Sequence, residues 1–422
     1  MSRGRHRALL VLVAIVVVVI ALGGALVVLT RGGAGAVDAP VRVHIGAGPA
    51  AIAVDGASGH IFVAAPDAAS VRMVDEAAAT LLPPIAVGPS PMALGIDGLH
   101  SRVYVRAIDR LTILDARDGR VTATAASGPS PYGVAVDSAL GVVLAPDLTN
   151  GAVLILDGAS GVTRATVRVG ARPLLPAVDE TTGRAYVPNS GDGTLSILDI
   201  ARGRVLQTVK VGGSPTVVAV DARAGRVVVG FAGNPQGGSS SDPAIVVLDA
   251  HSGTIVSRVT MARSPGAVAD IAIDSAAGAA FVANHDADNV TVLDLHSGAV
   301  RRVVPLAKGA HPIDIADDAV AGAVVVACIN DETAVVLDAR DGHVRRLEHL
   351  SGPPLAVAVD STTGTAVLAV AVGRETVSDP WASVPGWVPR GLASWLPFLP
   401  KPGTLTHAVA PNVTLLPAAS LR

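Results

Sequence analysis

The residues with the greatest potential for chemistry form one short polar run, Asn284-His285-Asp286-Ala287-Asp288. Carboxylate and amide oxygens bind hard cations, and an imidazole serves as a general base near neutral pH. The run therefore suggests either a cation site or a histidine that polarises an ester-like substrate. No second cluster at metal-ligand spacing accompanies it, so an ordinary polar loop is the competing interpretation.

Arg172 and His311 are the other candidates, because each precedes a proline that recurs along the chain at a position where the remaining copies carry small residues or proline. The ligand site of a repeat protein is expected at positions where the copies of the repeat differ from one another. The candidate ligand site therefore comprises Arg172, His285, Asp286, Asp288 and His311. The chain lacks a Gly-x-Ser-x-Gly elbow, a phosphate-binding loop of the Walker type and a His-Glu-x-x-His helix. No cofactor or metal is implied by a motif, and binding is favoured over catalysis.

The candidates are positioned by a repeat of about 42 residues, in which a proline is followed six residues later by aspartate and then, four residues on, usually by glycine. An aspartate at the end of a hydrophobic run accepts backbone N–H groups of a tight turn, while glycine adopts positive φ. We interpret the eight first aspartates of the copies as structural turn residues: Asp55, Asp97, Asp137, Asp179, Asp221, Asp274, Asp318 and Asp360.

Each copy contains four short stretches of alternating apolar residues, which predict four β-strands. One such sheet cannot bury both of its faces, so the sheets are expected to stack radially as the blades of an all-β propeller. The count favours eight blades, with seven blades and an extra hairpin as the alternative. Residues 41–45 form an orphan strand that should close the ring, and 405–409 are predicted as the third strand of the last blade. The candidate loops should all lie at one mouth of the central channel.

The frame Pro-x-x-x-Ala-Val-Asp, Gly-x-x-Tyr-Val-x-Asn, Val-x-Val-Leu-Asp resembles the YVTN-type propeller repeat, which also occurs in lactonase-like propellers. Tyr186-Val187-Pro188-Asn189 and Phe281-Val282-Ala283-Asn284 match the namesake strand best, and the resemblance covers residues 41 to about 372. It implies an exported or surface protein, typically of seven blades, whose repeat residues are structural. A lactonase-like hydrolase or a cofactor-binding enzyme that uses the channel mouth is the alternative function.

The amino terminus carries a basic flank (residues 1–7) followed by 22 uncharged residues (8–29), enough to cross the hydrocarbon core of a bilayer as a helix. This pattern predicts a signal-anchor with a cytoplasmic amino terminus, a linker over 30–40, and a propeller over 41–422 outside the cytoplasm of a bacterial cell. The alternative is secretion after cleavage near Ala36, since Ala34-Gly35-Ala36 has the form of a cleavage site.

The composition limits the classes of partner that this protein is expected to bind. A net charge of −3 without a basic stripe gives no reason to expect nucleic-acid binding, and the single cysteine, Cys328, excludes an intrachain disulfide. The tryptophans lie together in a Trp- and Pro-rich insertion (379–403) in the last blade, which suggests either contact with the membrane interface or packing against the propeller: Trp381, Trp387 and Trp395.

Overall fold

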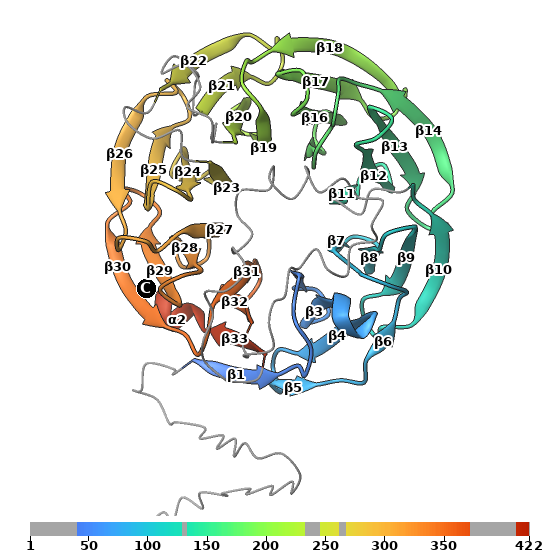
Figure 1. Ribbon diagram of the computed structural model, residues 1–422, viewed down its shortest axis with the longest axis vertical. Helices are drawn as coiled ribbons and strands as arrows, with labels where there is room; N and C mark the ends of the chain where they lie inside the picture. Colours follow the sequence, from blue (N-terminus) through green and yellow to red (C-terminus); the bar gives the residue numbers. More distant parts are fainter. Residues whose placement is uncertain (1–39, 129–132, 233–244, 261–266, 372–410, 422) are drawn as a thin grey trace, which may run out of the picture. The chain divides into compact units, whose positions relative to one another are not determined.

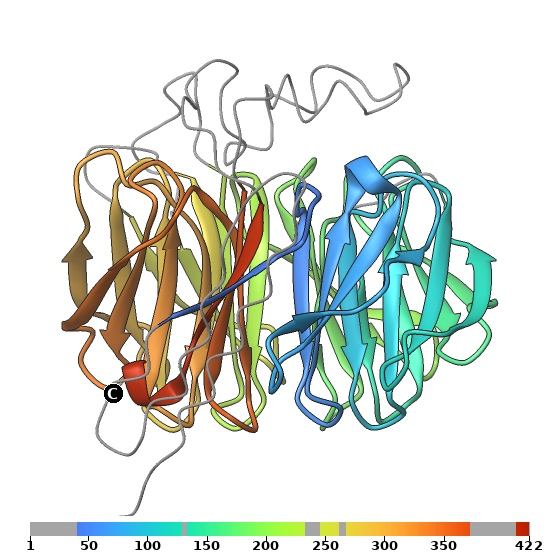
Figure 2. The same ribbon diagram turned by 90° about the horizontal axis from the view of Figure 1, so that it is seen from below.

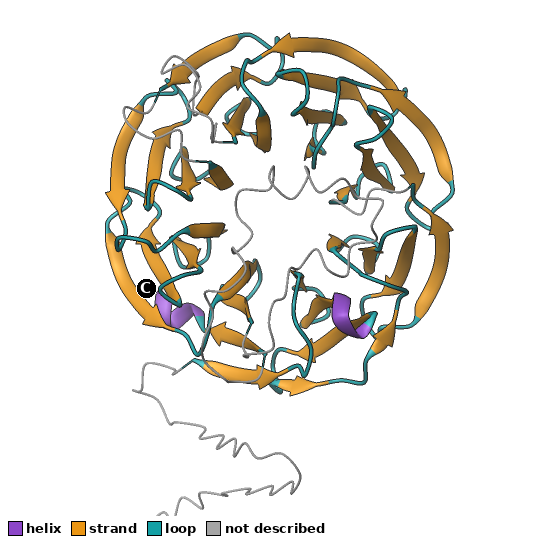
Figure 3. Cartoon of the chain, in the orientation of Figure 1, coloured by secondary structure: helices purple, strands orange, loops and turns teal. Residues whose placement is uncertain are grey.

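The structure is a computed structural model and describes residues 40–128, 133–232, 245–260, 267–371 and 411–421. Eight antiparallel sheets surround a central axis, and they account for nearly all regular structure of the described residues (Figures 1 and 3). The predicted eight-bladed propeller of four-stranded blades is confirmed, and the seven-bladed alternative is wrong. Residues from Ala39 to Arg422 form a compact unit of their own.

The first four blades follow the chain in order. Blade one contains η1 (Pro66–Ala68), β2 (Ala51–Asp55), β3 (His60–Ala65), β4 (Ser70–Asp75), β5 (Thr80–Leu81) and β6 (Ile85–Ala86). Blade two contains β7 (Ala93–Asp97), β8 (Arg102–Arg106), β9 (Arg110–Asp115) and β10 (Val121–Ala126). Blade three contains β11 (Ala135–Asp137), β12 (Val142–Asp147), β13 (Ala152–Asp157) and β14 (Thr163–Arg168). Blade four contains β15 (Ala177–Asp179), β16 (Arg184–Asn189), β17 (Thr194–Asp199) and β18 (Arg204–Lys210).

The last four blades complete the ring. Blade five contains β19 (Pro215–Asp221), β20 (Arg226–Phe231), β21 (Ile245–Asp249) and β22 (Ile255–Val259). Blade six contains β23 (Val268–Asp274), β24 (Ala279–Asn284), β25 (Asn289–Asp294) and β26 (Val300–Pro305). Blade seven contains β27 (Pro312–Asp318), β28 (Ala323–Cys328), β29 (Thr333–Asp338) and β30 (Val344–His349). Blade eight contains β31 (Pro354–Asp360), β32 (Thr365–Val370), β33 (Asn412–Leu416) and β1 (Val41–His44), and the helix α2 (Ala418–Leu421) follows β33.

The ring closes in blade eight, where β1 from the start of the chain pairs antiparallel with β33 from its end. The predicted orphan strand therefore closes the ring as expected. The predicted third strand of this blade is wrong: β33 begins at Asn412, whereas residues 405–409 lie outside the described part of the chain. In the sequence, the insertion (379–403) lies between β32 and its partner β33, so the repeat spacing no longer locates this strand. Two stretches of alternating apolar residues, 405–409 and Asn412–Leu416, were therefore both compatible with the third strand.

The hydrophobic core lies between neighbouring blades. Second and third strands are sandwiched by the blades on either side, so both of their faces are buried; all six residues of β24 are buried. Outer strands alternate, as in β14, because only one of their faces meets a neighbour. Cys328 is among the fully buried core residues of blade seven.

Seven of the eight turn aspartates, all except Asp55, accept a backbone N–H group of their turn through the carboxylate, as predicted. The carboxylates of Asp137, Asp221 and Asp274 each accept a backbone N–H group two or three residues ahead, and the glycines that end these turns have φ near +60°. Blade two lacks this glycine, and Ser101 adopts the same left-handed conformation there.

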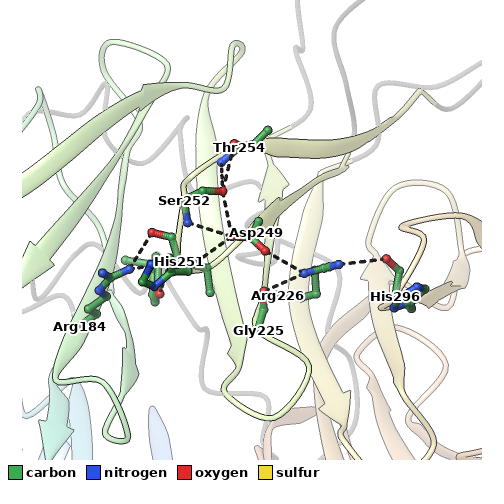
Figure 4. Close-up of polar contacts among 10 residues, drawn as sticks. Arg184, Gly225, Arg226, Asp249, His251, Ser252, Thr254 and His296 are labelled. Carbon is green, nitrogen blue, oxygen red and sulfur yellow. Dashed lines mark hydrogen bonds and ion pairs between the residues drawn. The ribbon is translucent and has the colours of Figure 1, made fainter.

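Arginines connect neighbouring blades across the turns between third and fourth strands (Figure 4). Arg226 of blade five donates to the carboxylate of Asp249 in its own blade, at 3.1 Å, and to the backbone carbonyl of His296 in blade six. Arg184 of blade four donates in the same way to the backbone carbonyl of His251 in blade five. Because the planar guanidinium offers several donors in fixed directions, one side chain serves two blades at once.

The antiparallel order gives the ring two distinct faces (Figure 2). We call the face that carries the aspartate turns the turn face. The opposite face, called the mouth face, carries the loops that join second to third strands and those that lead from one blade to the next inner strand. All five residues of the predicted ligand site lie in loops of the mouth face, in agreement with the sequence analysis.

No helix among the described residues is long and apolar enough to cross a membrane. The predicted anchor (8–29) and the three tryptophans of the insertion (379–403) lie outside the described residues.

Candidate functional site

Two histidines and an aspartate meet on the mouth face where blades six and seven adjoin. His285 and Asp286 begin the loop between β24 and β25, and His311 ends the loop between β26 and β27. Nδ1 of His285 lies 2.7 Å from Oδ1 of Asp286 and 3.4 Å from Nδ1 of His311, and the two imidazole centroids are 4.6 Å apart. The His285 side chain is 12% exposed and that of Asp286 is 44% exposed. This trio can therefore be reached from solvent on its aspartate side.

The electrostatics of the trio favour an ionised carboxylate. The hydrogen bond from His285 lowers the pKa of Asp286, and the neighbouring His311 lowers it further. Asp286 also accepts the backbone N–H of Ala267 through its other oxygen, at 3.3 Å. The carboxylate is thus negatively charged and held in place from two sides at neutral pH.

Asp288 has a positioning role in this structure. Its carboxylate accepts the backbone N–H groups of Gly309 at 2.6 Å and of His311 at 3.0 Å. It therefore fixes the loop that presents the His311 imidazole, and its oxygens are engaged by the backbone. Asn284 is likewise engaged within its own hairpin, where its amide donates to Asn289 and Thr291.

His311 occupies a left-handed backbone conformation, with φ of +49°, immediately before Pro312. This conformation is costly for a residue with a β-carbon, and a following proline restricts the backbone further. Two contacts hold it: the bond from the His311 N–H to Asp288 and the bond from the Ile329 N–H to the His311 carbonyl. The protein thus maintains a strained backbone at the residue that carries the second imidazole.

Blade four carries serines at the positions equivalent to the two histidines. Ser190 and Ser214 take the places of His285 and His311, and each hydroxyl donates to a backbone carbonyl at 3.0 Å. Arg172 lies in this part of the mouth face, in the loop before blade four, with φ of +54°. Blade five separates it from blades six and seven, so the structure groups His285, Asp286, Asp288 and His311 but places Arg172 elsewhere on the ring.

Two carboxyls on the inner strands of blades six and seven were not predicted from the sequence. Asp270 of β23 and Asp314 of β27 are hydrogen-bonded to each other across neighbouring blades, and Asp314 also accepts the Val357 N–H of β31 at 2.8 Å. Burial raises the pKa of both groups, and the adjacent Asp314 raises that of Asp270 further. Two carboxyls this close cannot both ionise readily, so the pair holds a proton more tightly than a single carboxyl does.

Asp317 is a third inner-strand carboxyl that the sequence analysis missed, and it lies toward the turn face. Burial and the neighbouring Asp274 and Asp318 raise its pKa to about 7. The repeat contained the signal for all three residues. The position of Asp270 and Asp314 is apolar or glycine in the other six inner strands, and the position of Asp317 is valine or isoleucine in the other seven.

Two further features of the described residues lie away from the trio. Asp338, Asp341 and His343 approach one another in the blade-seven turn, but Asp338 is bound by Arg345 and by backbone N–H groups of that turn. A groove of about 560 Å³ lies on the outer rim between blades one and two, and its lining includes Met73. Neither adjoins the channel mouth.

No protein family and no curated protein matches the sequence. Among solved structures, the computationally designed protein Ika8 is similar with a TM-score of 0.61 and 16% identity, covering 77% of this chain and 94% of the other. Hydrazine synthase of Kuenenia stuttgartiensis has a TM-score of 0.56 and 14% identity over 70% of this chain and 96% of its own. BamB from Moraxella catarrhalis has a TM-score of 0.56 and 16% identity over 80% of this chain and 96% of its own. At these identities the likeness shows the propeller fold alone, and the YVTN-type resemblance stays a prediction.

Proposed function

We propose that this protein is a binding module, tethered to the membrane outside the cytoplasm, whose ligand site is the mouth face at blades six and seven. The observation that carries the proposal is the meeting of His285, Asp286 and His311 from two blades at positions that blade four fills with Ser190, Gly191 and Ser214. Departures from the residues that a repeat otherwise uses are expected where a function requires them.

The site suits a small polar ligand. It offers imidazole nitrogens and an ionised carboxylate, the acceptor and donor groups that orient a bound molecule through a few directed hydrogen bonds. An apolar ligand would leave these groups unpaired at a cost of about 1–3 kcal/mol each. A segment of a protein partner that presents the same polar groups would meet the same requirements.

A thermal-shift screen of the unit that starts at Ala39 tests this proposal, since β1 and β33 close the ring within that unit. The probes are small lactones, sugars, amino acids and carboxylic acids. We expect at least one probe to raise the melting temperature saturably, because ligand at 100 times its Kd adds about 2.7 kcal/mol of stability. The double variant His285→Ser/His311→Ser, which carries residues that the repeat uses at these positions, should lose the shift. A shift that is equal in both proteins would place the ligand elsewhere.

Hydrolysis of a lactone or another ester is the second candidate function. It is favoured by the 2.7 Å contact of His285 with Asp286, because a carboxylate that orients an imidazole is the arrangement of a general base. A lactone probe would be consumed by the unmodified protein and left intact by His285→Ser. If no probe is turned over and one binds, the protein is a binding module.

The membrane tether rests on the 22 uncharged residues (8–29) behind a basic flank. We expect the full chain to sediment with membranes and to resist extraction at high salt. Proteolysis of intact cells should remove the propeller if it faces outward. Recovery of a soluble protein that begins near Val37 would replace the tether by a cleaved signal peptide.

A further inference from the structure

We infer that His285, Asp286 and His311 form a binding site for a divalent transition-metal ion of the zinc class. This inference rests on the proposed function, because it names the group through which the mouth of blades six and seven would hold its ligand. The donors are Nδ1 of each imidazole and one carboxylate oxygen of Asp286, and all three atoms lie within 4.8 Å of one another.

The spacing of the two nitrogens matches a metal edge. Zinc–nitrogen bonds of 2.0–2.1 Å arranged tetrahedrally place two nitrogens about 3.3 Å apart. Nδ1 of His285 and Nδ1 of His311 are 3.4 Å apart. A neutral imidazole has one donor nitrogen and one acceptor nitrogen. The two Nδ1 atoms can therefore hold at most one hydrogen between them at this distance. A metal at this place also needs the contact between His285 and Asp286 to open from 2.7 Å by about 0.6 Å, and the Asp286 oxygen to lie at the same spacing from His311, from which it is now within 4.8 Å.

The donor types select the metal. Two imidazoles and one carboxylate suit zinc and its neighbours, whereas calcium and magnesium prefer sites built from oxygen alone. Asp286 contacts His285, and Asp288 of the same loop is bonded to the backbone of His311, so two carboxyl groups lie beside the imidazoles and favour a cation. Three protein ligands leave a coordination position open, which is the arrangement of zinc sites that bind a further molecule.

Backbone hydrogen bonds hold the two histidines in place before a metal binds. His285 is held by the bond from its N–H to the Ala267 carbonyl, and His311 by Asp288 and Ile329. A site whose ligand-bearing loops are ordered before the metal arrives loses little conformational entropy on binding. The left-handed φ of His311 is shared by Ser90 and Arg172 at the equivalent position, and in blade seven it carries an imidazole whose ring lies 4.6 Å from that of His285.

Calorimetry with ZnCl₂ alone tests the inference, on untagged protein that starts at Ala39 and has been treated with a chelator. We expect one Zn²⁺ per chain. Single variants His285→Ser, His311→Ser and Asp286→Asn should each weaken binding at least about tenfold, as expected for the loss of one of three ligands. Co²⁺ should give the visible absorption of a tetrahedral ion, and this absorption should disappear in His311→Ser.

The chain already accommodates these substitutions at equivalent places. Ser90 has φ of +49° before Pro91, as His311 has before Pro312. Asn330 follows β28 as Asp286 follows β24. The variants should therefore fold, and a loss of binding would report on the donors themselves.

Two control variants separate this site from other histidines. His343→Ala removes the histidine of the blade-seven turn, and His296→Ala removes an exposed histidine on the turn face; both should bind Zn²⁺ as the unmodified protein does. Loss of binding in His343→Ala alone, or no Zn²⁺ binding at all, would overturn the inference. Failure of the metal site leaves the proposed function standing if a probe still stabilises the metal-free protein through His285 and His311. Binding of Zn²⁺ without any probe would support the metal site and count against the small-molecule function.

Discussion

Replacing Arg106 by alanine is expected to lower the free energy of unfolding by about 3–5 kcal/mol, the cost of disrupting a buried charged contact. Arg106 is completely buried at the end of β8 and donates to the carbonyls of Ser127, Gly133 and Pro146, each at 3.0 Å. These carbonyls belong to the end of blade two and to blade three. Alanine would leave them without this donor, and it would leave a cavity between the two blades.

The charge of Arg106 contributes to this effect. Burial lowers the pKa of the guanidinium to about 10, and the nearby carboxylate of Asp147 opposes that shift, so the side chain stays protonated at neutral pH. Without Arg106, the buried Asp147 loses its neighbouring positive charge.

Urea denaturation followed by circular dichroism measures the loss for Arg106→Ala. The free energy of unfolding of Arg106→Lys should lie between those of the unmodified protein and Arg106→Ala, because an ammonium keeps the charge but cannot reach three carbonyls in the same geometry. Arg120→Ala is the control: this arginine is 66% exposed, and its loss should cost less than about 1 kcal/mol. A loss for Arg106→Ala no larger than that of the control would show that the ring tolerates three unpaired carbonyls between blades two and three.

Replacing Asp317 by valine is expected to stabilise the propeller by about 2–3 kcal/mol above pH 7. The other seven inner strands carry valine or isoleucine at this position, so the variant restores the repeat. Oδ1 of Asp317 is buried and has no hydrogen-bond partner among the described residues. A pKa raised to about 7 from an ordinary value near 4 corresponds to roughly 4 kcal/mol at most, at about 1.4 kcal/mol per unit, and partial exposure reduces it.

The pH dependence of this gain has a definite sign. Between pH 4 and pH 7 the folded state retains the Asp317 proton and the unfolded state does not, so the stability of the unmodified protein falls as the pH rises through this range. Above pH 7 the carboxylate is ionised in both states and the full cost is present. The gain from Asp317→Val should therefore shrink toward pH 4, where only the packing of the valine remains.

Denaturation of both proteins at pH 4.5, 6 and 8 tests this expectation. Asp317→Asn should show the same dependence on pH without the packing gain. Asp118→Asn, at an exposed turn, should show none. The Asp270–Asp314 pair also titrates, but it is present in every protein compared and cancels from the difference. A gain that is constant with pH would mean that Asp317 ionises without cost.

Much of the architecture could be predicted because it depends on local interactions. The alternation of apolar residues marks the strands, and Asp137 and its equivalents mark the turns through contacts within four residues. Ring closure followed from one unpaired strand, β1. The third strand of blade eight was missed because the insertion interrupts the repeat, and local alternation alone does not decide between residues 405–409 and Asn412–Leu416.

The candidate site was predicted in part. The polar run at His285 and the departure at His311 were both visible, and the structure brings them together, while Arg172 lies beyond blade five. The three carboxyls of the inner strands were missed because they occupy strand positions that the other copies fill with apolar residues or glycine, and the alternation that predicts a strand does not register a single polar exception. Alignment of the inner strands alone would have revealed them.

The sequence by itself determined most of the strands, the turns and the closure of the ring and favoured eight blades, since period-two patterning and turn chemistry act over a few residues. Only the tertiary structure decided which variable residues meet. His285 and His311 are 26 residues apart, and Asp270 and Asp314 belong to neighbouring copies of the repeat. They meet because radial stacking sets equivalent positions of adjacent blades against each other, and that contact depends on how whole sheets pack rather than on any local pattern.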